Sequence, residues 1–120
     1  MTYFGAIRAA TTTKENSSLE IEIKTERLFK ELFEQNKLED SEIISVILTI
    51  TSDLTKLNPA KVLREKLGLN STALVCMQEA RIEGGLPLCI RALVHVNFKV
   101  KRDIKHIYQE EARFLRKDWL

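Results

Sequence analysis

The stretch from residue 74 to residue 94, LVCMQEARIEGGLPLCIRALV, constrains the fold of this 120-residue chain more than any other segment. Two apolar runs flank the pair Gly84–Gly85, and this pattern predicts two strands on either side of a turn. Each run carries one charged residue, Glu79 or Arg91. A charge within an apolar run is costly without a partner, so the two residues either form a buried ion pair or face a polar ligand.

Four segments have the β-branched or aromatic content that is typical of strands: 2–10, 43–51, 72–79 and 88–98. The run at 43–51, IISVILTIT, carries no charge, which predicts a central strand buried on both faces. The threonines and polar residues at 11–17 predict a loop after the first strand.

Two further segments are predicted to form helices. In 18–36 the apolar residues form one stripe, Ser17 and Glu20 form a possible capping box, and Asn36 is a suitable stop. The segment 59–67 begins with an Asn-Pro pair, which suits a cap and a first helical position.

The segment 103–116 fits either a helix or a bulged strand, and its periodicity leaves both open. The order of elements predicts a single α+β domain over residues 1–120, in which both helices pack on one face of a mixed sheet.

The charge balance argues against a nucleic-acid or membrane surface. The chain has 19 basic and 17 acidic residues and a net charge of only +2. We interpret the interrupted basic cluster at 99–105 as a solvated loop rather than an anion-attracting rim. No run approaches the roughly 18 apolar residues of a membrane span.

Compartment can be inferred from the cysteines and the first residues. Cys76 and Cys89 have no metal-ligand spacing, which predicts free structural thiols in a reducing compartment. The opening segment lacks the basic and long apolar parts of a signal peptide, so we expect a cytoplasmic protein.

The sequence offers few of the groups that catalysis usually needs. His95 and His106 have no evident acidic partner, and the glycine pair lacks the spacing and the lysine of a phosphate loop. No His/Cys/Asp cluster suggests a metal. An enzyme built on this chain would therefore use no nucleophile, no metal and no cofactor.

Several short motifs follow one another along the chain: IRAATT at 7–12, NPAK at 58–61 with Arg64, CMQE at 76–79, GGL at 84–86, CIR at 89–91, H-x-Y at 106–108 and LR at 115–116. Together they resemble the small monofunctional chorismate mutases of the AroH class. Each motif alone is weak, whereas the ordered set, which spans residues 5–118, is specific.

The resemblance implies that the chain converts chorismate to prephenate, a step of the shikimate pathway to the aromatic amino acids, without cofactor or metal. It also implies a homotrimer with a pseudo α/β barrel and active sites between neighbouring subunits. The reaction is an intramolecular Claisen rearrangement, in which one C–O bond breaks while one C–C bond forms. Negative charge grows on the ether oxygen of a dicarboxylate, so the site needs fixed cations, one donor and walls that hold the compact conformer.

By this resemblance, Arg91 donates to the ether oxygen and Glu79 accepts from the ring hydroxyl, so the two face a ligand rather than chiefly each other. Arg8 binds a carboxylate, helped by the Tyr108 hydroxyl. The backbone of Cys76 lies nearby. The remaining substrate-binding residues that it implies form the entrance, partly from the neighbouring subunit, and the wall: Lys61, Arg64, Arg116, Ala60, Leu74, Val75 and Leu115.

Some positions depart from the family pattern. Asn58 stands where an aromatic residue is common, and Val75 where threonine is common. Lys117 follows Arg116 in place of a frequent proline. From the stop at Leu120 we expect little of the tail that can cover the site. These departures concern affinity and closure more than the reaction.

Two alternatives belong to other functional classes. A non-catalytic trimeric small-molecule binder or regulator of similar architecture would not need a donor reserved for the ether oxygen. A compact α+β RNA-binding module would need aromatic residues exposed on a sheet face and a stronger basic patch, and neither is evident.

Overall fold

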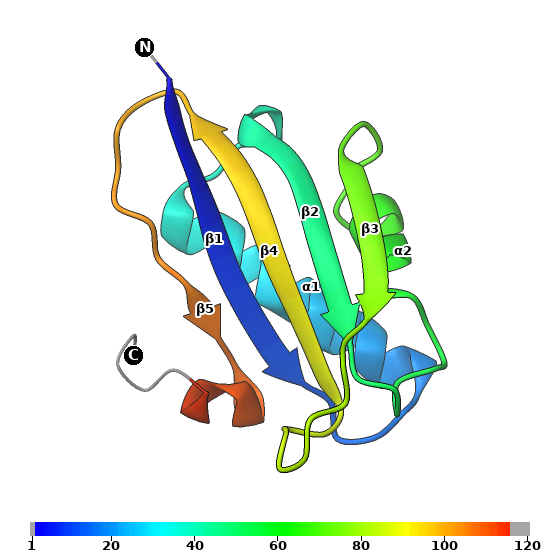
Figure 1. The fold of residues 1–120 in the computed structure, drawn as a ribbon. Helices are drawn as coiled ribbons and strands as arrows, with labels where there is room; N and C mark the ends of the chain where they lie inside the picture. Colours follow the sequence, from blue (N-terminus) through cyan, green and yellow to red (C-terminus); the bar gives the residue numbers. More distant parts are fainter. Residues whose placement is uncertain (1, 116–120) are drawn as a thin grey trace.

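The structure is a computed structural model that describes residues 2–115, and it consists of a five-stranded sheet backed by two helices (Figure 1). The elements in chain order are β1 (Tyr3–Thr12), α1 (Ser18–Asn36), η1 (Asp40–Glu42), β2 (Ile43–Ile50), α2 (Pro59–Glu65), β3 (Ala73–Gln78), β4 (Cys89–Phe98), β5 (Ile107–Tyr108) and η2 (Glu110–Phe114). The two η elements are short 3₁₀ turns. The predicted order of strands and helices is confirmed.

The two strands of the 74–94 stretch are separated by β2 and are not joined as neighbours by the glycine turn. The sheet order is β3-β2-β4-β1-β5. Strand β2 is parallel to β3 and antiparallel to β4, while β1 is antiparallel to β4 and parallel to β5. The connection from Gln78 to Cys89 therefore passes the end of β2 (Figure 1). Spanning two strand separations requires this long loop, because a tight hairpin turn joins only adjacent strands.

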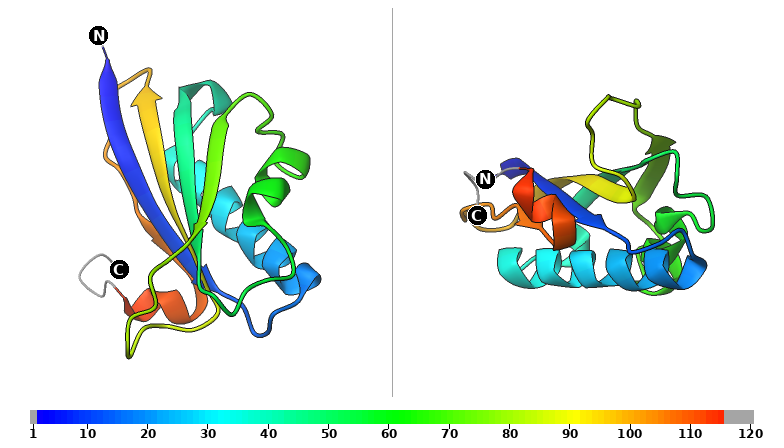
Figure 2. Two further views of the ribbon diagram at one scale, coloured as in Figure 1. Left: turned by 45° about the vertical axis from the view of Figure 1, so that its right-hand side comes forward. Right: turned by 90° about the horizontal axis from the view of Figure 1, so that it is seen from below.

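Both helices cover the same face of the sheet, as predicted (Figure 2). The stripe on α1 is buried there, with Leu28, Phe29 and Leu32 fully covered. Each such side chain stabilises the packed state by about 1.5–3 kcal/mol, so this stripe anchors α1. Val46 and Leu48 of β2 belong to the same core.

The ends of α1 follow the sequence signals only in part. The Ser17 hydroxyl accepts from the Glu20 amide at 3.1 Å, but the Glu20 carboxylate accepts from the Lys14 amide and does not close a capping box. Asn36 is the last helical residue, as predicted. Its buried side chain bonds both the amide and the carbonyl of Lys105, at 2.8 and 2.9 Å, and thereby fixes a segment far along the chain.

Two element boundaries differ from prediction. Strand β1 runs to Thr12, beyond the predicted end at residue 10, because β4 continues beside it as a partner. Thr11 and Thr12, expected in a loop, are thus buried in a strand. Helix α2 starts at Pro59 behind its Asn58 cap, as predicted, but ends at Glu65 instead of residue 67.

The basic cluster at 99–105 is not simply a solvated loop. Arg102 is half-buried, donates to the Lys37 carbonyl at 2.6 Å and pairs with the buried Glu42 at 2.9 Å. Burial by itself raises the pKa of Glu42, but backbone hydrogen bonds from Glu39 and Lys99 and the charge of Arg102 hold that pKa below its ordinary value. These contacts tie the segment to the end of α1.

The described part of the segment 103–116 forms neither a continuous helix nor a continuous strand. The two-residue strand β5 is followed by the 3₁₀ turn η2. Neither is long enough to produce a clear period in the sequence.

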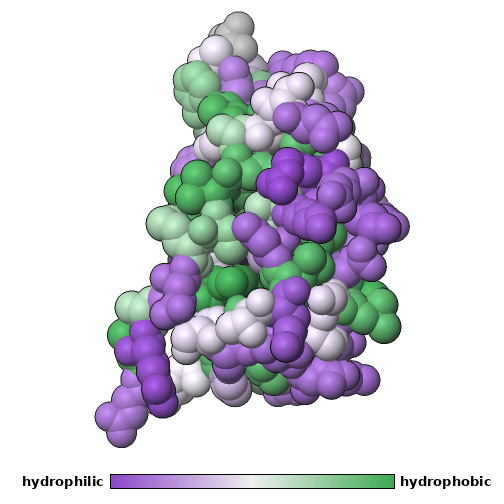
Figure 3. Space-filling view, turned by 90° about the vertical axis from the view of Figure 1, so that its right-hand side faces the viewer, coloured by the Kyte–Doolittle hydropathy of each residue, from purple (hydrophilic) through white to green (hydrophobic). Residues whose placement is uncertain are grey.

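The face of the sheet opposite α1 carries no described helix, and only the loop after β3 rises above it (Figure 2). The prediction that β2 is buried on both faces is therefore wrong for the single chain: Ile44 is half exposed and Ile47 only half-buried. Val75 and Met77 of the edge strand β3 are also exposed, and hydrophobic residues gather on this side of the molecule (Figure 3). Among the described helices, none has the length and apolar character that crossing a membrane requires.

Candidate active site

Three of the predicted catalytic residues come together on this open face. In the strand registers, Thr49 lies opposite Arg91, Arg91 opposite Ala10, and Ala10 opposite Tyr108. Opposed residues share a face of the sheet, so Arg91 and Tyr108 stand on either side of the small Ala10 side chain. Arg8 precedes Ala10 by two residues, and because strand side chains alternate it projects to the same face.

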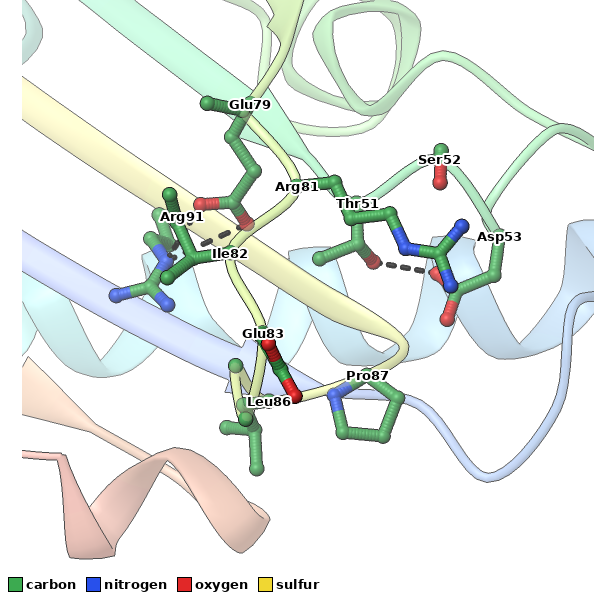
Figure 4. Close-up of a pocket in the computed structure, with 13 residues that line it drawn as sticks. Thr51, Ser52, Asp53, Glu79, Arg81, Ile82, Glu83, Leu86, Pro87 and Arg91 are labelled. Atoms are coloured by element: carbon green, nitrogen blue, oxygen red, sulfur yellow. Dashed lines mark hydrogen bonds and ion pairs between the residues drawn. The ribbon is translucent and has the colours of Figure 1, made fainter.

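Glu79 joins this group from the end of β3. Its Oε2 lies 2.9 Å from Nε of Arg91 (Figure 4), and the side chains of Glu79 and Arg91 are 20% and 36% exposed. The ion pair considered from the sequence therefore forms. Within the described part of the chain, the two terminal nitrogens of Arg91 have no hydrogen-bond or ion-pair partner. Both residues also line a pocket, so pairing does not remove them from a ligand's reach.

This pocket, of about 720 Å³, lies between the 79–88 loop, the start of β4 and the residues that follow β2 (Figure 4). The loop turns at Gly84, which has φ of 81°, a conformation that favours glycine. At Gly85 a Cβ atom would lie 2.9 Å from the carbonyl oxygen of Ile82. The glycine pair thus shapes the loop that carries Glu79 toward Arg91.

Thr51 and Asp53 line the same pocket and were missed as site residues by sequence reasoning. The Asp53 carboxylate accepts from the Leu88 amide at 3.0 Å and from the Thr51 hydroxyl, which itself accepts from the Cys89 amide at 2.9 Å. These bonds hold Leu88 at φ of 50°, which is unfavourable for a residue other than glycine. The only signal in the sequence was a Thr-Ser-Asp triplet after a strand, a pattern typical of any turn.

The two thiols are free and are poorly suited to nucleophilic chemistry. Burial raises the pKa of Cys89 to about 11, although the nearby charge of Arg91 acts in the opposite direction. Burial also raises the pKa of Cys76. Because the thiolate is the reactive form, both groups are weak nucleophiles at neutral pH.

The other predicted binding residues lie on the far edge of the sheet, away from Arg8 and Tyr108. They belong to α2, which carries Ala60, Lys61 and Arg64, or to β3, which carries Leu74, Val75 and Cys76. The charged pair on α2 is exposed and Ala60 is buried. On β3, Val75 is on the open face, while Leu74 and Cys76 pack against the core.

The remaining two predicted residues follow η2. Leu115 is half-buried, and Arg116 lies outside the described residues. Across residues 2–115 there is no group of three or more His, Cys, Asp or Glu side chains placed to hold a metal ion.

The fold and the cluster define a class: a small α+β protein that presents fixed guanidinium groups, a carboxylate and a phenol on one sheet face. Such a set is suited to holding a small anionic ligand by directed hydrogen bonds.

Comparison with known proteins identifies the family. The model for chorismate mutase type I matches residues 4–119, and the chain belongs to this family. The chorismate mutase AroH of Bacillus subtilis (strain 168) is 37% identical over 113 residues, covering 93% of this chain and 89% of the relative. The AroH protein of Thermus thermophilus is 34% identical over 114 residues, with 93% of both chains covered. A solved chorismate mutase from Clostridium thermocellum superposes with a TM-score of 0.87 at 45% identity, over 92% of this chain and 98% of its own.

Proposed function

We propose that this chorismate mutase accelerates the rearrangement of chorismate to prephenate chiefly by holding the guanidinium of Arg91 at the ether oxygen. The single observation that supports this role is the pairing of Arg91 Nε with Glu79, which leaves the two terminal nitrogens to face a ligand. The carboxylate orients the planar fork before substrate arrives. A preorganised donor of this kind is worth about 3–4 kcal/mol, or roughly 10²–10³ in rate.

The neighbours of Arg91 supply the remaining contacts. Arg8 binds one substrate carboxylate, and the Tyr108 hydroxyl donates to the same group; both project from the face that carries Arg91. Glu79 accepts from the ring hydroxyl with Oε1, which lies 3.4 Å from Nε of Arg91, farther than Oε2 at 2.9 Å. These groups restrain the compact conformer that the reaction requires, and the step itself transfers no proton to the protein.

The active enzyme is a homotrimer, and each site is completed by a neighbouring subunit. The half-exposed apolar residues on the open face, among them Ile44, Val75 and Met77, support burial against another copy. Among the described residues, those predicted to contact substrate belong in part to α2 and the edge strand β3, whereas Tyr108 belongs to the opposite edge strand β5. A cyclic, head-to-tail contact places the β3 edge of one chain beside the β5 edge of the next, because heterologous interfaces join different surfaces.

In that arrangement Lys61 and Arg64 of the neighbour attract the dianion at the entrance. The apolar wall consists of Ala60, Leu74, Val75 and Leu115, with the Cys76 backbone close to the ring and Arg116 at the mouth. Closing the three sheets around one axis produces the pseudo α/β barrel. We place this single-domain enzyme in the cytoplasm, in keeping with its two free thiols.

The test is to follow the loss of chorismate by ultraviolet absorbance with purified protein, with chelator and without added cofactor. Prephenate should accumulate in step with the loss. The Arg91→Ala variant retains Glu79 and the rest of the pocket. Its kcat should fall by roughly 10²–10³-fold or more, the effect of losing one preorganised donor. Wild-type turnover by this variant would refute the role given to Arg91.

A further inference from the structure

Helix α1 contains a buried cation that the apolar stripe does not explain. Lys24 is only 5% exposed, and it lies on the sheet-facing side beside the buried Ile21 and Thr25. Its Nζ is 3.0 Å from Oε1 of Glu110, which belongs to η2, 86 residues away in sequence. A buried ammonium requires a partner, so this position depends on Glu110.

Glu110 has an unusual backbone. Its φ is 53°, in the left-handed region that residues with a Cβ atom rarely adopt. The chain makes this turn immediately after Tyr108 and Gln109. Such a conformation persists only where the surroundings hold it. The Glu110 carboxylate pairs with the buried Lys24 and, at 3.5 Å, with the exposed Arg27, so Lys24 is the partner that reaches it from the core.

Strand β5, which carries Tyr108, is short, and the residue after it, Gln109, also donates its side-chain amide to Glu31 of α1. Strand β5 comprises only Ile107 and Tyr108, paired with Ala9 and Ala10 of β1. The pairing with β1 extends one residue further, because the Gln109 amide donates to the Ala10 carbonyl at 2.9 Å. The Glu111 amide then donates to the Thr12 hydroxyl at 3.1 Å, so Glu110 lies between two contacts that align the segment with β1.

We propose that Lys24 and Glu110 are positioning residues for Tyr108. Their ion pair holds the left-handed turn at Glu110, and this turn keeps Tyr108 opposite Ala10, on the face that carries Arg91 and Arg8. Neither residue touches the substrate. The inference rests on the role in carboxylate binding proposed above for Tyr108, and it extends the site to the hidden side of α1.

The first test is the Lys24→Met variant, which keeps the length of the side chain and removes its charge. Its KM for chorismate should rise about two- to tenfold, the effect of one weakened hydrogen bond, while kcat changes less. The matched control is Lys30→Met on the same helix, which breaks only an exposed pair with Glu26 and should behave as wild type. Hydrogen exchange should quicken at the Gln109 and Glu111 amides of Lys24→Met and remain unchanged in β2.

The second test places Lys24→Met in a Tyr108→Phe background. If Lys24 acts through the Tyr108 hydroxyl, the double variant should have the KM of Tyr108→Phe alone, although its stability is lower. Equal KM increases in both backgrounds, or a fall in stability with KM unchanged, would overturn the positioning role. Should Lys24→Met fail to fold, Glu110→Gln replaces it, because the Glu110 side chain is 35% exposed and tolerates the change.

The two proposals can fail separately. A wild-type KM in Tyr108→Phe refutes the carboxylate contact of Tyr108 and with it the catalytic purpose of the ion pair. Hydrogen exchange in Lys24→Met then decides the structural half: unchanged exchange at the Gln109 amide shows that the ion pair does not hold the segment. An impaired Tyr108→Phe together with a wild-type Lys24→Met refutes the positioning role alone.

Discussion

The carboxylate of Glu79 lies 2.9 Å from Nε of Arg91, although the strands β3 and β4 that lead to these residues are separated by β2. The pair exists because the 79–88 loop crosses the end of β2 and returns to the sheet at Cys89. The loop is fixed at both ends, by the Glu79 amide on the Ile50 carbonyl and by Asp53 on the Leu88 amide. The geometry of the guanidinium therefore depends on loop conformation as much as on strand register.

Replacing Arg91 by lysine should abolish most turnover while leaving the fold intact. Lysine keeps the charge but cannot both pair with Glu79 and aim two further donors, because only the guanidinium is a planar fork. We expect kcat to fall by roughly 10²-fold or more, as for loss of a preorganised donor. Steady-state kinetics and circular dichroism measure the two effects. Lys30→Arg, an exposed substitution on α1 whose ion pair is with Glu26, is the control, and near-normal kcat in Arg91→Lys would contradict the assignment.

Mixed trimers should regain activity lost in two separate variants. Arg91→Ala removes the donor on the central strand β4, and Arg64→Ala removes the entrance cation on α2, which in this proposal serves the site of the neighbouring chain. If sites form between chains, refolding an equal mixture should restore roughly a quarter of the sites, because each needs an intact residue from each of two randomly mixed subunits.

The mixing experiment has a direct control in particle mass. Three chains of 13.8 kDa should sediment as a species of about 41 kDa, both for the wild type and for each variant. A monomer that is active, or a mixture that remains as inactive as its components, would rule out intersubunit sites.

Glu42→Gln should destabilise the protein at neutral pH and much less in acid. The folded-state pKa of Glu42 lies below its ordinary value of 4.5, so its contribution is present above that value and is lost as pH falls through the folded-state pKa. At pH 7 the loss should be about 2–3 kcal/mol, as for hydrogen bonds to a buried charge. Urea unfolding at fixed protein concentration measures it. Glu39→Gln, whose partner Lys99 is exposed, should change stability little at either pH.

Thiol labelling should distinguish the two cysteines. With a pKa of about 11, Cys89 carries almost no thiolate at pH 8 and should react only after unfolding. Cys76 is only half-buried, although burial raises the pKa of its thiol too. Any slow labelling of the native protein should therefore occur at Cys76. Mass spectrometry of iodoacetamide-treated protein reports both sites. Rapid modification of Cys89 in a Cys76→Ala variant would show that its burial is not maintained in solution.

Local signals in the sequence were sufficient for most of the elements. The stripe that includes Leu28 and Leu32, the Asn58 cap and the uncharged run of β2 each depend on neighbouring residues, and the structure has the corresponding elements. The motifs shared with the family marked Arg8 and Arg91 as candidate site residues. These features are readable because they are set by short-range periodicity and by residue type.

Other features depend on contacts between distant segments, which no local pattern records. Residues far apart in sequence meet in three places. Strand β2 lies between β3 and β4, Lys24 pairs with Glu110, and the Asp53 carboxylate accepts from the Leu88 amide. No residue next to Lys24 in the sequence indicates that this lysine is buried. The sequence by itself determined the elements, the family and the chemical groups of the site. Only the tertiary structure decided which groups meet, because strand order and the burial of charged pairs are properties of the packed chain.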